Sequence, residues 1–435
     1  MNSHGESYIV GGAVRDFVMG IVPSDIDIAT NVPLIKIKEL FNWFDLGNNS
    51  EKFGIIGITV GSEVYEIAQF RGDGNYSDGR RPDEVKYVNS IEEDLARRDF
   101  TINAMAMSVC GKIIDPFGGL SDIQNKSIRC VGNPDNRISE DYLRILSAIR
   151  FAIRFDFTLD EDLILSIKSN VNKLDSLAKE RIYDELAKCS QMSGKKFAKV
   201  IDCMLTTKAL DVILPEISRL NEYDHDKESH PEGNVFRHTL SALECSEYRD
   251  STTNLAILFH DVGKPDTFKL RDGKHTYYGH DKAGLVIIDS VANRLRFPSK
   301  LKSYIKFCCE NHMKFHGIEK MKLSKVAKLM ESPTHWDTLK RVSFCDDIAR
   351  IKDRDFSRIK TKILNIKVLE SKVKASLELS KFLDGKLVMS IRGIESGKDV
   401  GNILKYVKSK VLDGKIKPDY DEVVLAINSY NLFGV

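Results

Sequence analysis

The chain lacks the features that mark several large classes of protein. Its 8 cysteines form no Cys-x-x-Cys pair and lie mostly within apolar helical patterns, which indicates reduced core residues of a cytosolic protein. No apolar run approaches the length of a membrane span, and the polar segment 1–6 lacks the shape of a signal peptide. We therefore expect a cytoplasmic protein without a membrane partner.

The chain also lacks an excess of charge of either sign. With 65 basic and 63 acidic residues, the formal net charge is +2, so any affinity for nucleic acid must come from local patches. No internal repeat or low-complexity tract is visible. With 435 residues, 42% of them hydrophobic, the chain is long enough for two or more domains with ordinary buried cores.

The pattern of hydrophobic residues changes near the segment Asn133-Pro134. Before it, β-like runs at 55–60, 64–70 and 112–114 alternate with glycine-rich turns; after it, helical spacing dominates. We therefore predict an α+β fold in which a head with a mixed sheet and helices is followed by all-helical parts. The predicted domains are a head (1–137), a helical neck (138–224), a further helical domain (225–350) and a helical tail (351–435).

Two acidic residues near the amino end are the strongest chemical signal. Asp25 and Asp27 are separated by one residue, so on a strand both side chains face the same way and can share divalent cations. They follow the pair Gly11-Gly12, which comes after an apolar strand and allows a close approach to phosphate. The helix expected over 13–19 favours negative charge at its amino end and carries Arg15, one turn in, as a phosphate clamp.

Nucleotidyl transfer needs two metal ions, to activate a hydroxyl and to neutralise the leaving pyrophosphate, and these ions need oxygen ligands. Glu66 lies in a run whose alternation suits a third carboxylate on a neighbouring strand, although an exposed strand residue would look the same. Arg97 and Arg98 precede a short apolar helix. Either arginine could clamp a phosphate beside the metal site.

Asp141 and Arg144 are three residues apart in an expected helix, which would place them on one face. An intrahelical ion pair is one interpretation. In the other, the carboxylate and guanidinium together match the edge of a base, and such a bidentate contact discriminates by roughly 1–3 kcal/mol.

These motifs, in this order, resemble the bacterial-type (class II) tRNA nucleotidyltransferases, or CCA-adding enzymes, and the related bacterial poly(A) polymerases. The resemblance covers the first half of the chain closely. It rests on Gly11-Gly12-x-x-Arg15-Asp16, Asp25-x-Asp27, the run 97–104, Glu140-Asp141-x-x-Arg144, Arg150-Phe151, and Glu180-Arg181 with Glu185. It implies that Asp25 and Asp27 bind Mg²⁺, that Asp141 and Arg144 read the base, and that nucleotide contacts come from Gly12, Arg15, Arg98 and Arg150.

The chain departs from the family pattern at Ser147, where many relatives carry arginine; the resemblance then implies weaker triphosphate binding without loss of chemistry. Poly(A) polymerases of the family carry a basic, glycine-containing signature after the aspartates. The stretch 46–53 is not basic in that way, which favours CCA addition. The segment 71–82 is similar to the flexible loop used in switching from C to A, or is an ordinary hairpin loop.

A second set of motifs lies in the region 225–350. His260-Asp261 ends an apolar helix, and adjacent imidazole and carboxylate groups can bracket one cation. The ordered set resembles the HD phosphohydrolase domain, which implies a site for Ni²⁺, Mn²⁺ or Mg²⁺ and hydrolysis of phosphomonoesters or cyclic phosphodiesters. Its candidate ligands are His238, His260, Asp261, His280, His312 and Asp347.

The expected function is template-independent completion of the 3′-terminal CCA of tRNA from CTP and ATP, with Mg²⁺ in the head and an accessory HD-domain activity. The alternatives are a poly(A) polymerase, or an HD hydrolase or tRNA-binding protein with an inactive head. Lysines of the tail (360, 362, 367, 372 and 374) form either a solvated helix face or an RNA contact. The oligomeric state, monomer or dimer, stays open.

Overall fold

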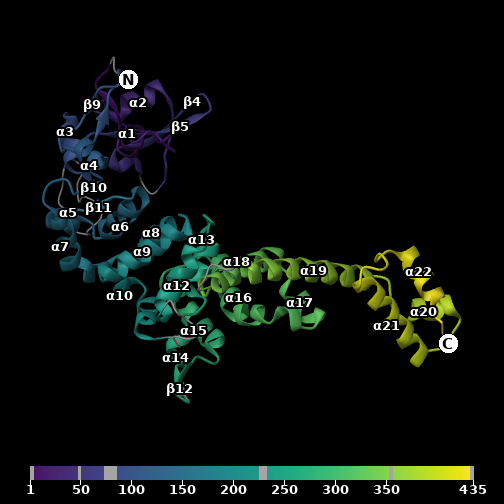
Figure 1. Ribbon diagram of the computed structural model, residues 1–435. Helices are drawn as coiled ribbons and strands as arrows, with labels where there is room; N and C mark the ends of the chain where they lie inside the picture. Colours follow the sequence, from purple (N-terminus) through teal and green to yellow (C-terminus); the bar gives the residue numbers. More distant parts are fainter. Residues whose placement is uncertain (1–3, 48–49, 73–85, 225–232, 352–355, 432–435) are drawn as a thin grey trace. The chain divides into compact units, whose positions relative to one another are not determined.

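A computed structural model describes residues 4–47, 50–72, 86–224, 233–351 and 356–431, and the structural statements below concern these residues. They fall into two compact units (Figure 1). The first comprises Met1–Glu222, Ser246–Asn254 and Asp289–Pro298, and the second comprises the remainder. The four domains predicted from the sequence are a finer division than these two units and stay a prediction. Within the described ranges no helix has the length and hydropathy needed to cross a membrane.

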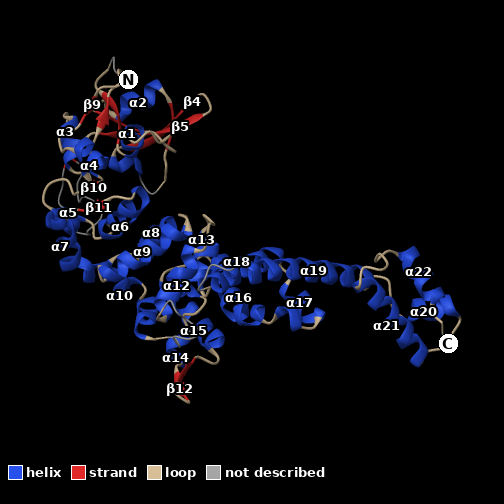
Figure 2. Cartoon of the chain, in the orientation of Figure 1, coloured by secondary structure: helices blue, strands red, loops and turns tan. Residues whose placement is uncertain are grey.

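The first unit begins with a seven-stranded mixed sheet (Figure 2). Its spatial order is β3-β4-β5-β2-β1-β8-β9. The strands are β1 (Ser7–Val10), β2 (Asp27–Thr30), β3 (Asn42–Phe44), β4 (Ile55–Val60), β5 (Glu63–Gln69), β8 (Ala106–Met107) and β9 (Ile113–Ile114). The β-like runs expected at 55–60, 64–70 and 112–114 correspond to β4, β5 and β9.

The register of the central strands positions the acidic residues. β2 pairs antiparallel with β1 and parallel with β5, and Asp27 lies opposite Glu66. Alternate side chains of these strands are apolar and buried, including Val10, Ala29 and Ile67. The two carboxylates therefore lie at one end of a strand pair that a hydrophobic core holds in place.

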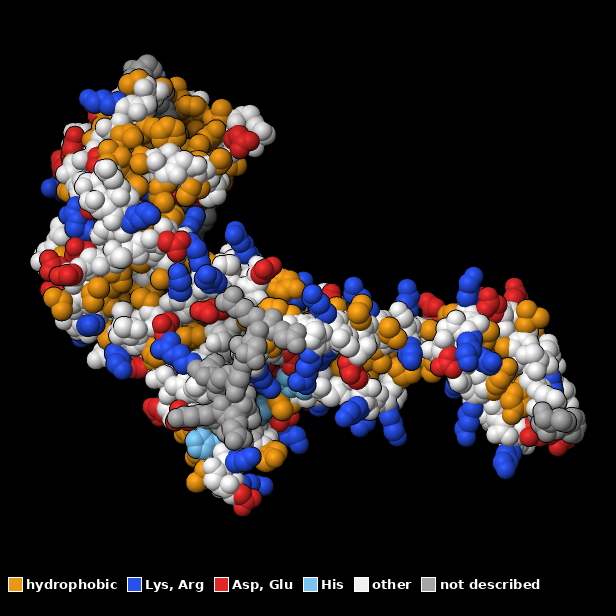
Figure 3. Space-filling model, viewed as in Figure 1, with side chains coloured by type: hydrophobic (Ala, Val, Ile, Leu, Met, Phe, Trp, Pro, Cys, Tyr) orange, Lys and Arg blue, Asp and Glu red, His pale blue; other side chains and the backbone are white. Residues whose placement is uncertain are grey.

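Short helices pack around the sheet, and hydrophobic side chains remain exposed over α1, α2 and the β4–β5 hairpin (Figure 3). Phe17, Ile35, Val60 and Val64 belong to this exposed set. The head elements outside the sheet are α1 (Gly12–Val18), α2 (Leu34–Leu40), η1 (Ser50–Phe53), α3 (Ile91–Ala96), η2 (Thr101–Asn103), α4 (Gly119–Asn125) and the small pair β6 (Arg71–Gly72) with β7 (Lys86–Tyr87). Most of the loop expected at 71–82 lies outside the described residues, as do Asn48 and Asn49.

The neck of the first unit is helical, as predicted. Its elements are α5 (Pro134–Glu140), α6 (Arg144–Phe155), α7 (Glu161–Asn170), η3 (Val171–Ser176), α8 (Lys179–Ser190), α9 (Gly194–Thr206), α10 (Ala209–Ile213), α11 (Pro215–Ser218) and η4 (Arg219–Glu222). A two-stranded parallel pair, β10 (Ser127–Ile128) with β11 (Thr158–Leu159), adds to it. Phe100 of the head packs edge-on against Phe151 of α6, so the sheet and the neck share apolar contacts.

The second unit is helical apart from one hairpin, and two of its helices extend into the first unit, to which residues 251–254 and 289–294 belong. Its elements are α12 (Val235–Glu244), α13 (Ser251–Phe259), α14 (Lys264–Thr267), β12 (Lys269–Arg271), β13 (Lys274–Thr276), α15 (His280–Arg294), α16 (Ser299–His316), η5 (Ile318–Lys320), α17 (Leu323–Leu329), α18 (Pro333–Ala349), α19 (Ser357–Leu379), α20 (Gly385–Arg392), α21 (Lys398–Leu412) and α22 (Tyr420–Ser429). α18 packs against α12 and α16, and α20–α22 enclose a separate core with the end of α19. The predicted α+β fold class is confirmed.

Candidate functional site

Three carboxylates gather at one end of strands β2 and β5. Asp27 and Glu66 are cross-strand neighbours in the parallel pair. Asp25 lies just before β2, and its Oδ1 accepts a hydrogen bond from Ser24 at 2.8 Å. The two aspartates are therefore not both within the strand, although Asp25 still influences the other two acids electrostatically.

The pKa values of Asp27 and Glu66 are raised, first by burial and then by the charge of neighbouring carboxylates. Burial raises the pKa of Asp27, and the charge of Asp25 raises it further, while Arg98 opposes the shift. Burial also raises the pKa of Glu66, with an added contribution from Asp27. Carboxylates that repel one another and offer only oxygen donors suit a hard divalent cation, which would relieve the repulsion. The donor set therefore fits Mg²⁺, held by Asp25, Asp27 and Glu66.

Gly11 explains why a glycine turn precedes this site. Its φ of 71° and ψ of −132° lie in a region that side chains rarely adopt, and a Cβ there would lie 2.7 Å from Nη1 of Arg98. Gly12 begins α1, and its Cβ position is 3.4 Å from Arg15. The bare backbone thus makes room for the Arg98 guanidinium beside Asp27.

Asp94 holds both arginines of the second motif. This carboxylate is 1% exposed and lies 2.8 Å from Arg97 and 3.3 Å from Arg98. Arg97 also donates to the carbonyl of Arg71 at 3.1 Å. The Arg97 guanidinium is thus bound to Asp94 and the Arg71 carbonyl. Arg98 lies close enough to Asp27 to act on its charge, and there it can contact a phosphate.

Arg15 lies on α1, as the sequence predicted, but its side chain has partners that the sequence did not suggest. It is 5% exposed, donates to Asp16 at 2.8 Å and to Asn103 at 2.5 Å, and its guanidinium lies 4.7 Å from the ring centroid of Phe155. Burial lowers its pKa. The expectation of a side chain free to clamp a phosphate is wrong: the guanidinium is occupied in joining α1, the second motif and α6.

The helix expected to carry both Asp141 and Arg144 is interrupted between them. α5 ends at Glu140, Asp141 is extended (φ −153°, ψ 102°), and α6 begins at Arg144. Arg144 donates to Glu140 at 2.5 Å, while Asp141 receives two hydrogen bonds from Arg181, at 3.1 and 2.6 Å. The intrahelical pairing of Asp141 with Arg144 is therefore wrong, because each side chain has a different partner.

Helix α8 contacts both Asp141 and Arg150, two residues that the resemblance assigns to nucleotide recognition. Besides Arg181, it supplies Glu185, whose Oε2 accepts from Nε of Arg150 at 2.6 Å. Arg150 also lies 4.2 Å from the ring centroid of Phe151. Ser147 lies one turn earlier on α6, half-buried.

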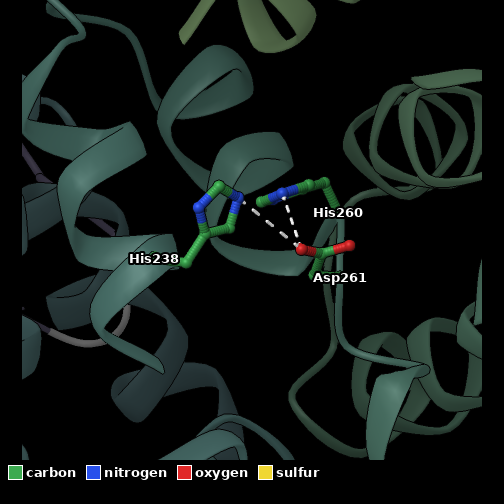
Figure 4. A group of neighbouring side chains, drawn as sticks. All are labelled: His238, His260 and Asp261. Atoms are coloured by element: carbon green, nitrogen blue, oxygen red, sulfur yellow. Dashed lines mark ion pairs between the residues drawn. The ribbon is translucent and has the colours of Figure 1, made fainter. Parts of the chain in front are cut away.

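The second unit contains a buried cluster of histidines and acids (Figure 4). His238 comes from α12, and His260 and Asp261 directly follow α13. His280 begins α15, and His312 lies on α16. The four histidines are at most 6% exposed, and Asp261 is 1% exposed. Four segments far apart in sequence therefore bring these predicted ligands together.

Asp261 divides the cluster into two ligand groups. Its Oδ2 lies 3.1 Å from Nε2 of His260 and 3.8 Å from that of His238. Its Oδ1 lies 3.3 Å from Nε2 of His280 and 3.5 Å from that of His312. In each group the donor atoms lie within 4.8 Å of one another. Each group could hold one cation, and the two would share the Asp261 carboxylate, where the sequence suggested one cation.

Backbone contacts aim the histidines inward. Nδ1 of His260, His280 and His312 each lies 2.7–2.8 Å from a backbone carbonyl, so Nδ1 can donate its proton there while Nε2 faces Asp261. Nε2 of His260 and both oxygens of Asp261 are buried without a well-formed hydrogen bond. Burial lowers the pKa of His312. Imidazole nitrogens and a carboxylate that converge in this way fit a divalent transition metal.

The aspartate on α18 that reaches this cluster is Asp346. Its Oδ1 lies 2.9 Å from Nε2 of His238. Asp347, the residue expected from the sequence, instead contacts Nδ1 of His316 at 2.9 Å and Lys362 at 2.5 Å. The assignment of Asp347 is corrected to Asp346, because adjacent helix positions diverge by about 100° and only one can face α12.

Three basic residues that sequence reasoning did not assign surround the cluster. Lys264 lies 2.6 Å from Asp261, Arg350 lies 2.7 Å from Asp346, and His316 bridges Asp346 and Asp347. Burial alone would raise the pKa of Asp261, but His260 and Lys264 hold it well below its usual value. The carboxylate therefore stays ionised, as a metal ligand must. In the sequence, Lys264 could have been identified as part of the site from its position three residues after Asp261.

Comparison with known proteins agrees with this geometry. Residues 7–129 match the family model of the poly A polymerase head domain, and residues 156–220 match the model described as the probable RNA and SrmB-binding site of polymerase A. The solved CCA-adding enzyme of Bacillus stearothermophilus in complex with CTP superposes with a TM-score of 0.65 at 22% identity, covering 98% of this chain and 93% of that one. The chain thus shares its fold with a solved CCA-adding enzyme.

Two sequence relatives define the family more closely. The CCA-adding enzyme of Ligilactobacillus salivarius (strain UCC118) is 31% identical over 423 residues, which cover 96% of this chain and 91% of the relative. That of Listeria monocytogenes serotype 4b (strain CLIP80459) is 40% identical over 223 residues, 50% of this chain and 55% of the relative. The chain belongs to the family of CCA-adding enzymes.

Proposed function

We propose that this chain completes the 3′-terminal CCA of tRNA, using CTP and ATP and releasing pyrophosphate. The observation that carries the proposal is the coupled carboxylate group Asp25, Asp27 and Glu66, next to a glycine turn and Arg98, in a chain related along nearly its whole length to a CCA-adding enzyme. The free cysteines support the cytoplasm as its place of action.

In the reaction the 3′ hydroxyl of the RNA attacks the α-phosphorus of the nucleotide, and the bond to the β-phosphate oxygen breaks. Mg²⁺ bound by the three carboxylates would supply activation of the hydroxyl and neutralisation of the pyrophosphate. Arg98, beside Asp27, neutralises phosphate charge from the protein side. Asp141 and Arg144, held by Arg181 and Glu140, present an acceptor and donors to the base.

A primer-extension assay tests the proposal and separates it from a poly(A) polymerase. A tRNA transcript lacking CCA is incubated with CTP alone and then with CTP and ATP, both with Mg²⁺. The account predicts two added nucleotides with CTP and three with both, followed by a stop. A transcript extended without limit by ATP, and unchanged by CTP, would identify a poly(A) polymerase instead.

A second function is favoured by the His-Asp cluster. We propose that it is a metal-dependent phosphohydrolase acting on phosphomonoesters or cyclic phosphodiesters. Divalent ions held by the two ligand groups of Asp261 would supply activation of water for attack on phosphorus. The test is hydrolysis of a 2′,3′-cyclic nucleotide and a nucleoside monophosphate by pure protein with Ni²⁺, Mn²⁺ or Mg²⁺. No turnover with any of the three metals would count against it.

A further inference from the structure

A basic pocket lies in the neck and shares Arg150 with the residues that the resemblance assigns to the nucleotide. Its volume is about 410 Å³. The cationic side chains that line it come from α6, α8, α9 and the connection before α13: Arg150, Arg154, Lys188, Lys196 and Arg249. No carboxylate is among its lining residues.

The positive charge of the pocket is only partly neutralised. Glu185 contacts Arg150 and Lys188, at 2.6 and 2.8 Å. Asp156 contacts Lys196 at 2.9 Å. Across the described ranges, neither Arg154 nor Arg249 has a carboxylate partner. Five cations thus meet two carboxylates, and the excess charge favours an anionic ligand.

The segment carrying Arg249 is fixed to the neck by buried polar contacts. Asn254 is fully buried and donates to the carbonyl of Ser190 at 2.9 Å. Its Oδ1 accepts from the hydroxyl of Ser246 at 3.0 Å, and the backbone of Gly194 donates to the carbonyl of Ser246 at 3.0 Å. These bonds hold Arg249 against the α8–α9 turn, so the pocket is a built feature of the fold.

We propose that this pocket binds a backbone phosphate of the tRNA strand that leads to the 3′ end. The proposal rests on the proposed CCA addition and adds to it a place for the RNA. Arg154 lies ten residues beyond Arg144 on α6, about 15 Å along the helix axis. At this distance Arg144, which the proposal places at the base, and Arg154 are within reach of one nucleotide strand, and exposed Arg and Lys side chains bind phosphates without reading sequence.

The test measures binding of a tRNA lacking CCA to the full chain at several salt concentrations. Arg154→Gln/Arg249→Gln should weaken binding about three- to tenfold and reduce the slope of log Kd against log salt by about one to two. Lys168→Gln, an exposed position on α7 outside the pocket, is the control and should bind as wild type. Arg154→Lys/Arg249→Lys should restore most of the affinity, which excludes misfolding as the cause.

The outcomes separate the pocket from the catalytic proposal. Wild-type CCA addition with unchanged tRNA affinity and salt slope in Arg154→Gln/Arg249→Gln would overturn the pocket alone. A raised KM for CTP, or weaker inhibition by pyrophosphate, at unchanged tRNA affinity would assign the pocket to the nucleotide and also overturn it. Absence of CCA addition by wild type, with salt-dependent tRNA binding that falls in the double variant, would overturn the catalytic proposal and keep the pocket.

Discussion

Glu185 on α8 accepts a hydrogen bond from Nε of Arg150 on α6 at 2.6 Å. Both side chains are nearly buried, with exposures of 3% and 11%. Arg181, one turn earlier on α8, holds Asp141 in the same way. Helix α8 therefore positions Asp141 and Arg150, two of the residues that the resemblance assigns to nucleotide recognition.

Removing the Glu185 charge should cost stability and change its pH dependence. Burial would raise the pKa of Glu185, but Arg150 and Lys188 lower it below the usual 4.5. The Glu185 carboxylate therefore makes its full contribution to the free energy of unfolding at pH values above its pKa in the unfolded chain. This contribution is lost as the pH falls through the lower pKa that Glu185 has in the folded protein. Glu185→Gln should lower the free energy of unfolding by about 2–4 kcal/mol at pH 7 and by less below pH ~4. Urea denaturation at several pH values measures this.

The exposed pair Asp175–Lys179 provides the control for that experiment. Asp175→Asn should leave the free energy of unfolding nearly unchanged, because exposed ion pairs contribute little. Equal losses in Glu185→Gln and Asp175→Asn would contradict the role given to the buried pair.

Arg181 should govern which nucleotide is chosen. In Arg181→Ala, Asp141 loses both of its hydrogen bonds from α8 and its orientation. We expect discrimination between CTP and UTP, measured as a ratio of kcat/KM values, to fall about tenfold or more. The amount of product formed with CTP at saturation should fall less. An unchanged ratio would show that Asp141 is positioned without Arg181.

Gly11 and Gly20 form a matched pair for testing the glycine turn. Both have positive φ, 71° and 70°, but a Cβ at Gly11 meets Arg98 whereas a Cβ at Gly20 meets nothing within 4 Å. Both alanine variants should lose about 1–3 kcal/mol through backbone strain. Only Gly11→Ala should also slow single-turnover incorporation, by displacing Arg98. Equal incorporation rates would remove Arg98 from the phosphate site.

Metal binding by the His-Asp cluster predicts a measurable stabilisation. Protein stripped by chelator and then given Mn²⁺ or Ni²⁺ at 100 times Kd should gain about 2.7 kcal/mol of stability per site. Asp261→Asn should lose this gain, since Asp261 belongs to both ligand groups. His335→Gln, a histidine on α18 that contacts Ser303 and Ser332, should keep it. Calorimetric titration that detects equal binding in Asp261→Asn would contradict the shared ligand.

Much of this arrangement was predictable from the sequence where local pattern determines it. Alternation and spacing predicted the strands β4 and β5 and the orientation of Glu66 toward Asp27. An apolar helix followed by His260-Asp261 predicted part of the buried cluster. In both places the spacing of apolar residues over a few positions already determines which side chains are buried in the folded protein.

The errors arose where a distant partner decides the position of a side chain. Helical spacing could not reveal that Asp141 leaves the helix to meet Arg181, forty residues later. Nor could it choose between Asp346 and Asp347, because that choice depends on the angle at which α18 packs against α12. Arg15 was misjudged because its partner Asn103 and the ring of Phe155 come from other parts of the first unit.

The most direct test of the account is single-turnover addition of CMP to a tRNA lacking CCA by wild type and by Asp27→Asn, with tRNA affinity measured in parallel. Asp27 lies at the centre of the carboxylate group, opposite Glu66. The account predicts Mg²⁺-dependent addition by wild type, a loss of at least a thousandfold in rate (about 4 kcal/mol) in Asp27→Asn, and unchanged affinity for tRNA. Incorporation by Asp27→Asn at a rate near that of wild type would contradict it.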